Sequence, residues 1–190
     1  GVNQAQWYDV ANNIITPIAD SGIVAYVEAF CSRLIMSTTG GTFLASVEGD
    51  PTDLDGTLFA AEIGVGDEIT GFKVTASNNM AIYTVRNTYS LTGTSATENW
   101  TLKMISQNSG ARPHCITDTD DYFASDDRGI CKLSRTDTLG GFGSATITDG
   151  IQPLFKRIAQ KASCATTIRR LNQMRFFYGT DCIIASQIEY

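Results

Sequence analysis

The feature that most constrains the fold of this chain is a pattern of short strands and tight turns that recurs along most of the sequence. It is clearest in residues 27–54, where strand 33–37, a turn at Gly40 and Gly41, and strand 42–47 lead into an acidic turn at residues 49–53. Both strands are rich in apolar and β-branched residues and are bounded by small polar residues, which is typical of paired β-strands. The segment therefore predicts a β-hairpin.

The same pattern returns three times further along the chain. The expected strands are residues 69–74, 80–85 and 88–91, then 113–117, 122–125 and 130–133, and finally 163–170, 174–178 and 182–188. Corresponding strands begin at Arg33, Met80, Tyr122 and Met174, so the units repeat every 42 to 52 residues, which is the range of blade-type repeats. Further strands are expected at residues 7–10, 14–18, 23–26, 58–63 and 100–106.

Four strands in each unit is the number found in the blades of β-propellers. We therefore expect an all-β protein, a β-propeller-like array of about four four-stranded antiparallel blades, not all of them complete. One segment departs from the pattern, because residues 152–162 place apolar side chains at helical spacing behind Pro153 in the first turn. This predicts one short α-helix with an apolar face and a basic face, preceded by a glycine-rich loop at residues 139–143.

The composition describes a folded protein of modest size. With 190 residues, 43% of them hydrophobic and 18% charged, residues 1–190 are expected to form a single domain with its own core. No run of about 18 apolar residues, as a transmembrane helix requires, is present. The chain begins at Gly1 rather than Met, and both ends fall in strand-like sequence, so we expect a processed chain or a piece of a longer one.

Five cysteines and one histidine give little basis for a metal or catalytic site. Cys31, Cys115, Cys131, Cys164 and Cys182 form no CxxC pair, and buried reduced thiols made in a reducing compartment are the expected state. His114 has no serine or cysteine partner in a recognisable motif, so we expect a structural or surface histidine.

Three acidic segments resemble known motifs without completing them. The carboxylates of residues 53–56 and 118–120 alternate as in calcium loops, but no glutamate completes an EF-hand, and solvated turns are the expected reading. Ser125, Asp127 and Gly129 have the spacing of the aspartate box of sialidase-like propellers, a hairpin turn that is remote from catalysis. A glycosidase needs two carboxylates across a sugar bond, and no pair stands out.

Charge is distributed unevenly along the chain. The net charge is −6, yet residues 151–180 contain six bases and no acid: Lys156, Arg157, Lys161, Arg169, Arg170 and Arg175. These six side chains are the candidate functional residues. They are expected either to pair with the acidic first half of a neighbouring subunit or to contact the phosphates of DNA, while a solvated basic face remains an alternative.

Several short strings between about Tyr26 and Tyr178 resemble, in order and spacing, the propeller portion of bacteriophage tail nozzle or hub proteins, including those called packaged-DNA stabilisation or tail tubular proteins. They are SRLIMS, ASVEGDPTDL, GDEITGFKV, MAIYTVRNTYSLTG, WTLKMIS, DDYFASDDRGICKL and RRLNQMRFFYG. Proteins of that family form a ring, typically sixfold, below the portal and adaptor, around the channel through which the genome leaves.

The resemblance implies a non-enzymatic virion protein of the phage tail, made in the host cytoplasm. Its implied partners are further copies of itself, the portal or adaptor and other tail proteins, and double-stranded DNA that passes without sequence specificity. No cofactor, metal or small-molecule substrate is expected, and the family supplies no active-site residues. The competing hypotheses are a propeller glycosidase or lyase acting on cell-surface glycans, and a protein-binding propeller of the WD40 or kelch kind.

Overall fold

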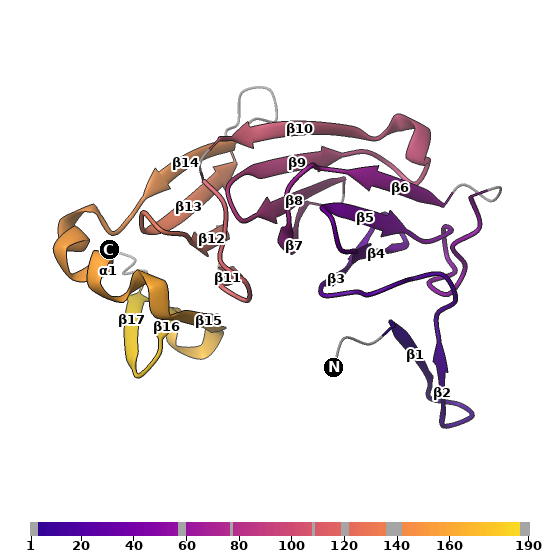
Figure 1. The fold of residues 1–190 in the computed structure, drawn as a ribbon, viewed down its shortest axis with the longest axis horizontal. Helices are drawn as coiled ribbons and strands as arrows, with labels where there is room; N and C mark the ends of the chain where they lie inside the picture. Colours follow the sequence, from indigo (N-terminus) through magenta and orange to yellow (C-terminus); the bar gives the residue numbers. More distant parts are fainter. Residues whose placement is uncertain are drawn as a thin grey trace. The chain divides into compact units, whose positions relative to one another are not determined.

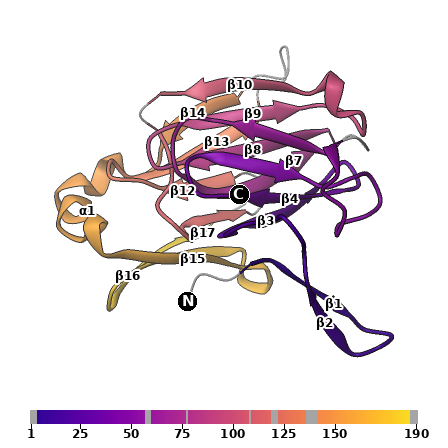
Figure 2. The same ribbon diagram turned by 45° about the vertical axis from the view of Figure 1, so that its right-hand side comes forward.

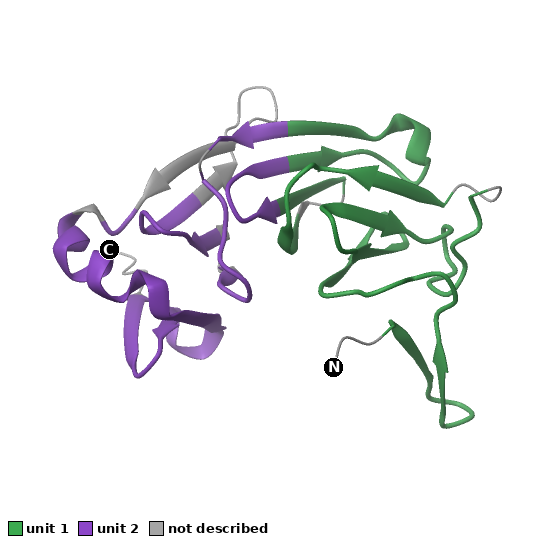
Figure 3. Ribbon diagram, in the orientation of Figure 1, with its two compact units in different colours: residues 1–82, 90–103 green, residues 83–89, 104–190 purple. Residues whose placement is uncertain are grey.

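The fold is that of a computed structural model, which describes residues 4–56, 60–76, 78–107, 109–118, 122–135 and 142–186. The described part of the chain is mostly β, with about 50% of its residues in strands and one short α-helix. Packing divides it into two compact units (Figure 3), one of residues 1–82 and 90–103 and the other of residues 83–89 and 104–190.

The first unit begins with a two-stranded sheet formed by β1 (Gln6–Asp9) and β2 (Ile14–Pro17). A four-stranded antiparallel sheet follows in chain order: β3 (Val27–Phe30), β4 (Arg33–Ser37), β5 (Thr42–Ala45) and β6 (Ala61–Gly64). The next sheet, also in chain order, contains β7 (Ile69–Ala76), β8 (Asn79–Thr84), β9 (Thr88–Thr92) and β10 (Thr101–Ser106). The division between the units runs through this sheet.

Aromatic side chains and one buried arginine hold the first unit together. Phe43 and Phe72 meet edge to face with ring centroids 6.0 Å apart, and Phe30 packs on Trp100 at 5.7 Å. Arg33 is only 5% exposed, and its guanidinium donates hydrogen bonds to the carbonyl oxygens of residues 46 and 95. The buried charge is therefore satisfied by backbone acceptors, as burial of an ionised group requires.

The second unit contains a third four-stranded antiparallel sheet and a three-stranded one (Figures 1 and 2). The former has β11 (Ile116–Asp118), β12 (Tyr122–Ser125), β13 (Ile130–Arg135) and β14 (Phe142–Thr146). The chain then forms a 3₁₀ turn, α1 (Gln152–Ile158) and the 3₁₀ helix η4 (Ala159–Lys161). The three-stranded sheet follows, with strands β15 (Ala162–Ile168), β16 (Gln173–Tyr178) and β17 (Asp181–Ser186), and the 3₁₀ helix η5 (Arg169–Leu171) connects its first two strands.

The core of the second unit lies where α1 packs on the face of this three-stranded sheet. On β16 the side chains of Met174, Phe176 and Tyr178 alternate inward, as the period of two in a strand requires. Phe155 of α1 is fully buried against them, with its ring edge to face with Tyr178 at 5.6 Å. The Tyr178 hydroxyl shares a 2.8 Å hydrogen bond with Ser125 of β12, which links the two sheets.

A close approach of the backbone explains one glycine of this unit. A Cβ atom at Gly110 would overlap the carbonyl oxygen of Thr84 at the end of β8, and the segment is held there by a 2.9 Å hydrogen bond that the Ala111 amide donates to the same oxygen. Only glycine fits without a shift of the backbone.

Within the described residues, most of the expected strands are confirmed within a few residues, and four local predictions are wrong. Residues 58–59 of expected strand 58–63 and residues 187–188 of expected strand 182–188 lie outside the described part. Residues 23–26 form no strand, since Ile23 makes only an isolated bridge with Gln4. Residues 113–115 form a turn before β11. The segment expected as a glycine-rich loop contains the start of β14, while residues 139–141 lie outside the described part. The α-helix ends at Ile158 instead of continuing to residue 162, whereas expected strand 163–170 is confirmed as Ala162–Ile168.

Candidate functional site

The candidate site is formed around α1 and η4, where buried and charged side chains alternate. Phe155, Ile158 and Ala159 are buried, whereas Lys156 and Arg157 are exposed. Pro153 occupies the first turn, where its missing N–H costs no intrahelical bond. The two cations occupy the last turn, where the partial negative charge of the helix C-terminus favours them.

Hydrogen bonds fix both ends of this helical segment to the turn between β12 and β13. At the start of α1, the Gln152 side chain donates to the carbonyl oxygen of Arg128 at 2.7 Å. At η4, Arg112 donates to the Gln160 side chain at 2.8 Å and forms an ion pair with Asp127. The helical segment therefore has a defined position in the second unit.

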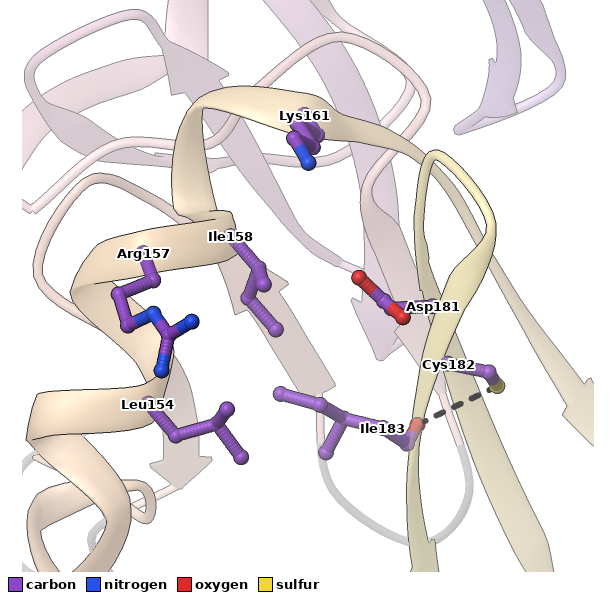
Figure 4. Close-up of a pocket in the computed structure, with 7 residues that line it drawn as sticks. All are labelled: Leu154, Arg157, Ile158, Lys161, Asp181, Cys182 and Ile183. Atoms are coloured by element: carbon purple, nitrogen blue, oxygen red, sulfur yellow. Dashed lines mark hydrogen bonds between the residues drawn. The ribbon is translucent and has the colours of Figure 1, made fainter.

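A groove of about 440 Å³ lies between this helical segment and the start of β17 (Figure 4). Figure 4 shows Leu154, Arg157 and Ile158 on the helix side and Asp181, Cys182 and Ile183 on the strand side. We call it the basic groove and define it by its seven lining residues, namely Leu154, Arg157, Ile158, Lys161, Asp181, Cys182 and Ile183.

The groove combines an apolar lining with an excess of positive charge. Leu154, Ile158 and Ile183 supply the apolar atoms, while Arg157 and Lys161 outnumber the single carboxylate of Asp181. Within the described part of the chain, neither cation forms an ion pair or a side-chain hydrogen bond. Such a surface can bind an extended segment that carries both an acidic group and an apolar side chain.

The structure does not gather all six candidate cations on one surface. Arg157 and Lys161 meet in the groove, and Lys156 is exposed beside them on α1. Arg169 and Arg170 are exposed on η5. The β15–β16 register pairs Ala162 with Tyr178 near the groove and Ile168 with Gln173 near η5. The two groups therefore lie at opposite ends of the sheet, about 20 Å apart at the rise of a β-strand.

Arg175 occupies a third position, in the middle of β16. Its neighbours Met174 and Phe176 are buried, so the half-buried Arg175 projects from the opposite face of the sheet. Its guanidinium reaches the Gln173 side chain at 3.4 Å. The basic segment of the sequence thus forms separate basic surfaces rather than one.

A second exposed surface, of opposite character, belongs to the first unit. The N-terminal hairpin, β1 with β2, exposes large apolar side chains on both strands: Trp7 by 44%, Tyr8 by 50%, Ile14 by 54% and Ile15 by 62%. Tyr8 lies directly opposite Ile15 in the register. An isolated two-stranded sheet is only marginally stable in water, and exposed apolar patches mark interaction sites. This hairpin therefore has the properties of a segment that packs on another protein surface.

The remaining motifs have structural positions. His114 is exposed in a turn, as expected, and its carbonyl oxygen accepts a 2.8 Å hydrogen bond from Ala165 of β15. The turn with aspartate-box spacing joins β12 to β13, but its organising carboxylate is the buried Asp126, which accepts hydrogen bonds from the amides of Arg128 and Gly129. In the first acidic segment, the Asp53 carboxylate accepts a hydrogen bond from the Asp55 amide in an exposed turn. Of the second acidic segment, residues 119–120 lie outside the described part.

The cysteines differ in part from expectation. Cys115 and Cys131 are buried thiols, whereas Cys164 and Cys182 are exposed on the edge strands of the three-stranded sheet. Burial raises the pKa of Cys115 to about 11, so its thiol stays protonated at neutral pH. Among the described residues no group of three or more histidine, cysteine or acidic side chains is arranged to hold a metal ion.

Sequence reasoning missed Leu154, Ile158, Asp181, Cys182 and Ile183 as members of the site. Leu154 and Ile158 were expected only as part of an apolar helix face, and the strand-side residues carry no motif. The available signal was the spacing of residues 154, 157, 158 and 161, which marks one helical face.

No model of a known protein family matches this chain, and no curated protein matches it. No helix in the described ranges has the length and the apolar composition that crossing a membrane requires. Hypotheses about function therefore depend on the sheets, the basic groove and the exposed hairpin.

Proposed function

We propose that this chain is a ring-forming structural subunit of a bacteriophage tail, a nozzle or hub protein that lines the conduit for genome retention and ejection. The observation that carries the proposal is the run of three four-stranded antiparallel sheets, each in simple chain order, followed by a three-stranded one. This is the strand order expected of successive propeller blades. The resemblance of the sequence to the propeller portion of tail nozzle proteins agrees with it.

Two exposed surfaces support a role in assembly. The second unit carries cations on α1, η4 and η5, and the first unit carries the exposed apolar hairpin. Surfaces of this kind are typical of subunits that bury them against neighbours. The proposed neighbours are further copies of this chain in a ring, and portal, adaptor or other tail proteins above and below it.

The overall negative charge fits passage of double-stranded DNA. A conduit that neutralised many phosphates would hold the duplex, because each neutralised phosphate adds salt-dependent affinity. With 20 acidic and 14 basic side chains, the subunit repels a polyanion on average, while the localised cations remain available for subunit contacts. The groove does not favour the glycosidase hypothesis, because Asp181 is the one carboxylate among the described residues that line it.

The mass of the native particle tests the proposal. Native mass spectrometry and negative-stain microscopy of the full chain at physiological salt should reveal a closed ring of about six copies with a central channel. A monomer at every protein concentration, including in the presence of tail neighbours, would contradict it. A linear duplex should bind weakly, with no preference between unrelated sequences.

The charge reversals Arg169→Glu and Arg170→Glu provide a second test. If η5 contributes to subunit contacts, the double variant should shift the ring toward smaller species, whereas the matched variant Arg169→Lys with Arg170→Lys should assemble as the parent does. If η5 instead contacts DNA, assembly should be unchanged and the residual binding of duplex should fall.

A further inference from the structure

Within the described residues, one edge of the three-stranded sheet of the second unit is unpaired. The three other main sheets have four described strands each in chain order, whereas this sheet has three, with β17 at its outer edge. At the β15 edge, the Ala165 amide donates a hydrogen bond to the carbonyl oxygen of His114, and the hydroxyls of Thr117 and Thr167 lie 2.5 Å apart. The segment that contains β11 therefore flanks that edge. Along residues 181–186, no described strand pairs with the outer side of β17, and such an edge is a template for a further strand.

The basic groove adjoins the first half of this open edge. Asp181, Cys182 and Ile183 belong to both features, so a strand added to β17 would run beside the groove. Strand addition supplies affinity through main-chain hydrogen bonds and specificity through pockets for side chains. The pocket here accepts an apolar side chain against Leu154 and Ile158 and favours acidic groups.

The N-terminal hairpin has the matching properties. It is a two-stranded sheet with exposed Trp7, Tyr8, Ile14 and Ile15, and residues 4–26 include two acids, Asp9 and Asp20, and no base. Hydrogen bonds from Asn12 lower the pKa of Asp9, so its carboxylate stays charged. The hairpin therefore combines strand edge, apolar side chains and negative charge.

We propose that β1 of the N-terminal hairpin of a second copy adds to the unpaired outer side of β17, with Trp7 against the groove and Asp9, on the same face of β1, toward Arg157 and Lys161. This inference rests on the proposed function, because it supplies the contact that builds the ring. Each copy carries both the hairpin and the unpaired outer side of β17, so it acts as donor and acceptor at once. Such a heterologous contact generates a closed ring when its rotation closes.

Cysteine cross-linking of the full chain tests this contact, because exposed Cys182 lies on β17. The variants Trp7→Cys and Tyr8→Cys place a thiol on the two faces of β1 in turn. Paired strands lie about 4.8 Å apart, within the Cα separation of about 4.4–6.8 Å that a disulfide needs. Cys182 lies on the face of β17 opposite Ile183, as Tyr8 lies on the face of β1 opposite Trp7. Under mild oxidation Tyr8→Cys should therefore link to Cys182 in high yield, and Trp7→Cys should not.

Two controls define the background. Val10→Cys places a more accessible thiol in the hairpin turn, at a residue 79% exposed but outside β1, and should give only collisional linkage. Adding Cys182→Ser to the reactive variant should abolish the product. Mixing equal amounts of ¹⁵N-labelled and unlabelled protein before oxidation distinguishes linkage between copies from linkage within one chain.

The expected product is a β1 peptide linked to the peptide that contains Cys182. In about half of these pairs, one peptide should be labelled and the other unlabelled. A ring that assembles normally but gives no link to Cys182, or links Cys164 instead, would overturn this inference and leave the proposed function standing. If every linked pair contained two labelled or two unlabelled peptides, the hairpin would be linked to β17 of its own chain, and this inference would again be overturned. A strict monomer would refute both proposals.

Discussion

Removal of the Phe155 ring should destabilise the second unit by about 4 kcal/mol. The side chain is fully buried between α1 and β16, and its ring packs edge to face on Tyr178. Phe→Ala at a buried position costs about 3–5 kcal/mol, through lost transfer free energy and the cavity that remains. Because small proteins show a urea dependence of about 2 kcal/mol per M, Phe155→Ala should lower the unfolding midpoint by about 2 M.

The two units permit a local readout of this change. Both tryptophans, Trp7 and Trp100, belong to the first unit, so tryptophan fluorescence follows that unit, whereas hydrogen exchange of α1 and β16 follows the second. The matched control is Leu154→Ala on the same helix, where the side chain is 52% exposed and should cost less than about 1 kcal/mol. Equal losses for the two variants would refute the assignment of Phe155 to the core.

Three further predictions concern the second unit. Tyr178→Phe leaves the Ser125 hydroxyl without its partner and should cost about 1–2 kcal/mol in urea unfolding, with Tyr178→Phe/Ser125→Ala recovering part of the loss. Burial raises the pKa of Cys115 from 9.0 to about 11 and that of Tyr178 from 10.0 to about 12, so the unfolded chain loses these protons first. The free energy of unfolding should therefore fall as the pH rises from about 9 to about 12, and a flat profile would contradict this. Gly110→Ala should cost at least about 1–3 kcal/mol in the same assay because its Cβ meets backbone, whereas Gly150→Ala, with nothing within 4 Å, should be near neutral.

The strands could be predicted from the sequence where the turns between them contain residues typical of turns, such as Gly, Asn and Asp, and were harder to predict elsewhere. The turn between β3 and β4 shows the limit. Phe30 pairs with Arg33, so Cys31 and Ser32 form a two-residue loop, and both have left-handed φ angles of 51° and 58°. This is the geometry of a type I′ hairpin turn, which favours Asn-Gly or Asp-Gly. Because Cys-Ser gives no such signal, residues 27–37 did not indicate two strands.

Tertiary context decided the other errors. β14 contains Gly143, which weakens its strand propensity, yet residues 142–146 pair with 131–135 of β13 along their whole length. Conversely, residues 23–26 have strand-like composition but find only the single bridge of Ile23 to Gln4. Strand propensity reflects the neighbours that a segment meets in the sheet, and a single sequence does not specify those neighbours.

The candidate site was predicted in its charges and not in its arrangement. The six cations follow directly from the sequence, but their separation depends on the β15–β16 register, which places η5 at the far end of the sheet from η4. The exposure of Cys164 and Cys182 also follows from the register of the strands in this sheet. Both pair with Phe177 across the sheet, on the face opposite the buried Phe176 and Tyr178.

The helical segment itself explains why the groove mixes apolar and charged groups. Residues 155, 158, 159 and 162 form the stripe that faces the core, while residues 154, 157, 158 and 161 form a second stripe, shifted by one residue, that lines the groove. One residue is about 100° around a helix, so the two stripes adjoin and share Ile158. An expected division into one apolar and one basic face therefore becomes three faces. It follows that Arg157 and Lys161 can be changed to test the groove without altering the core, whereas a change at Ile158 would alter both, and its effect on assembly would not report on the groove alone.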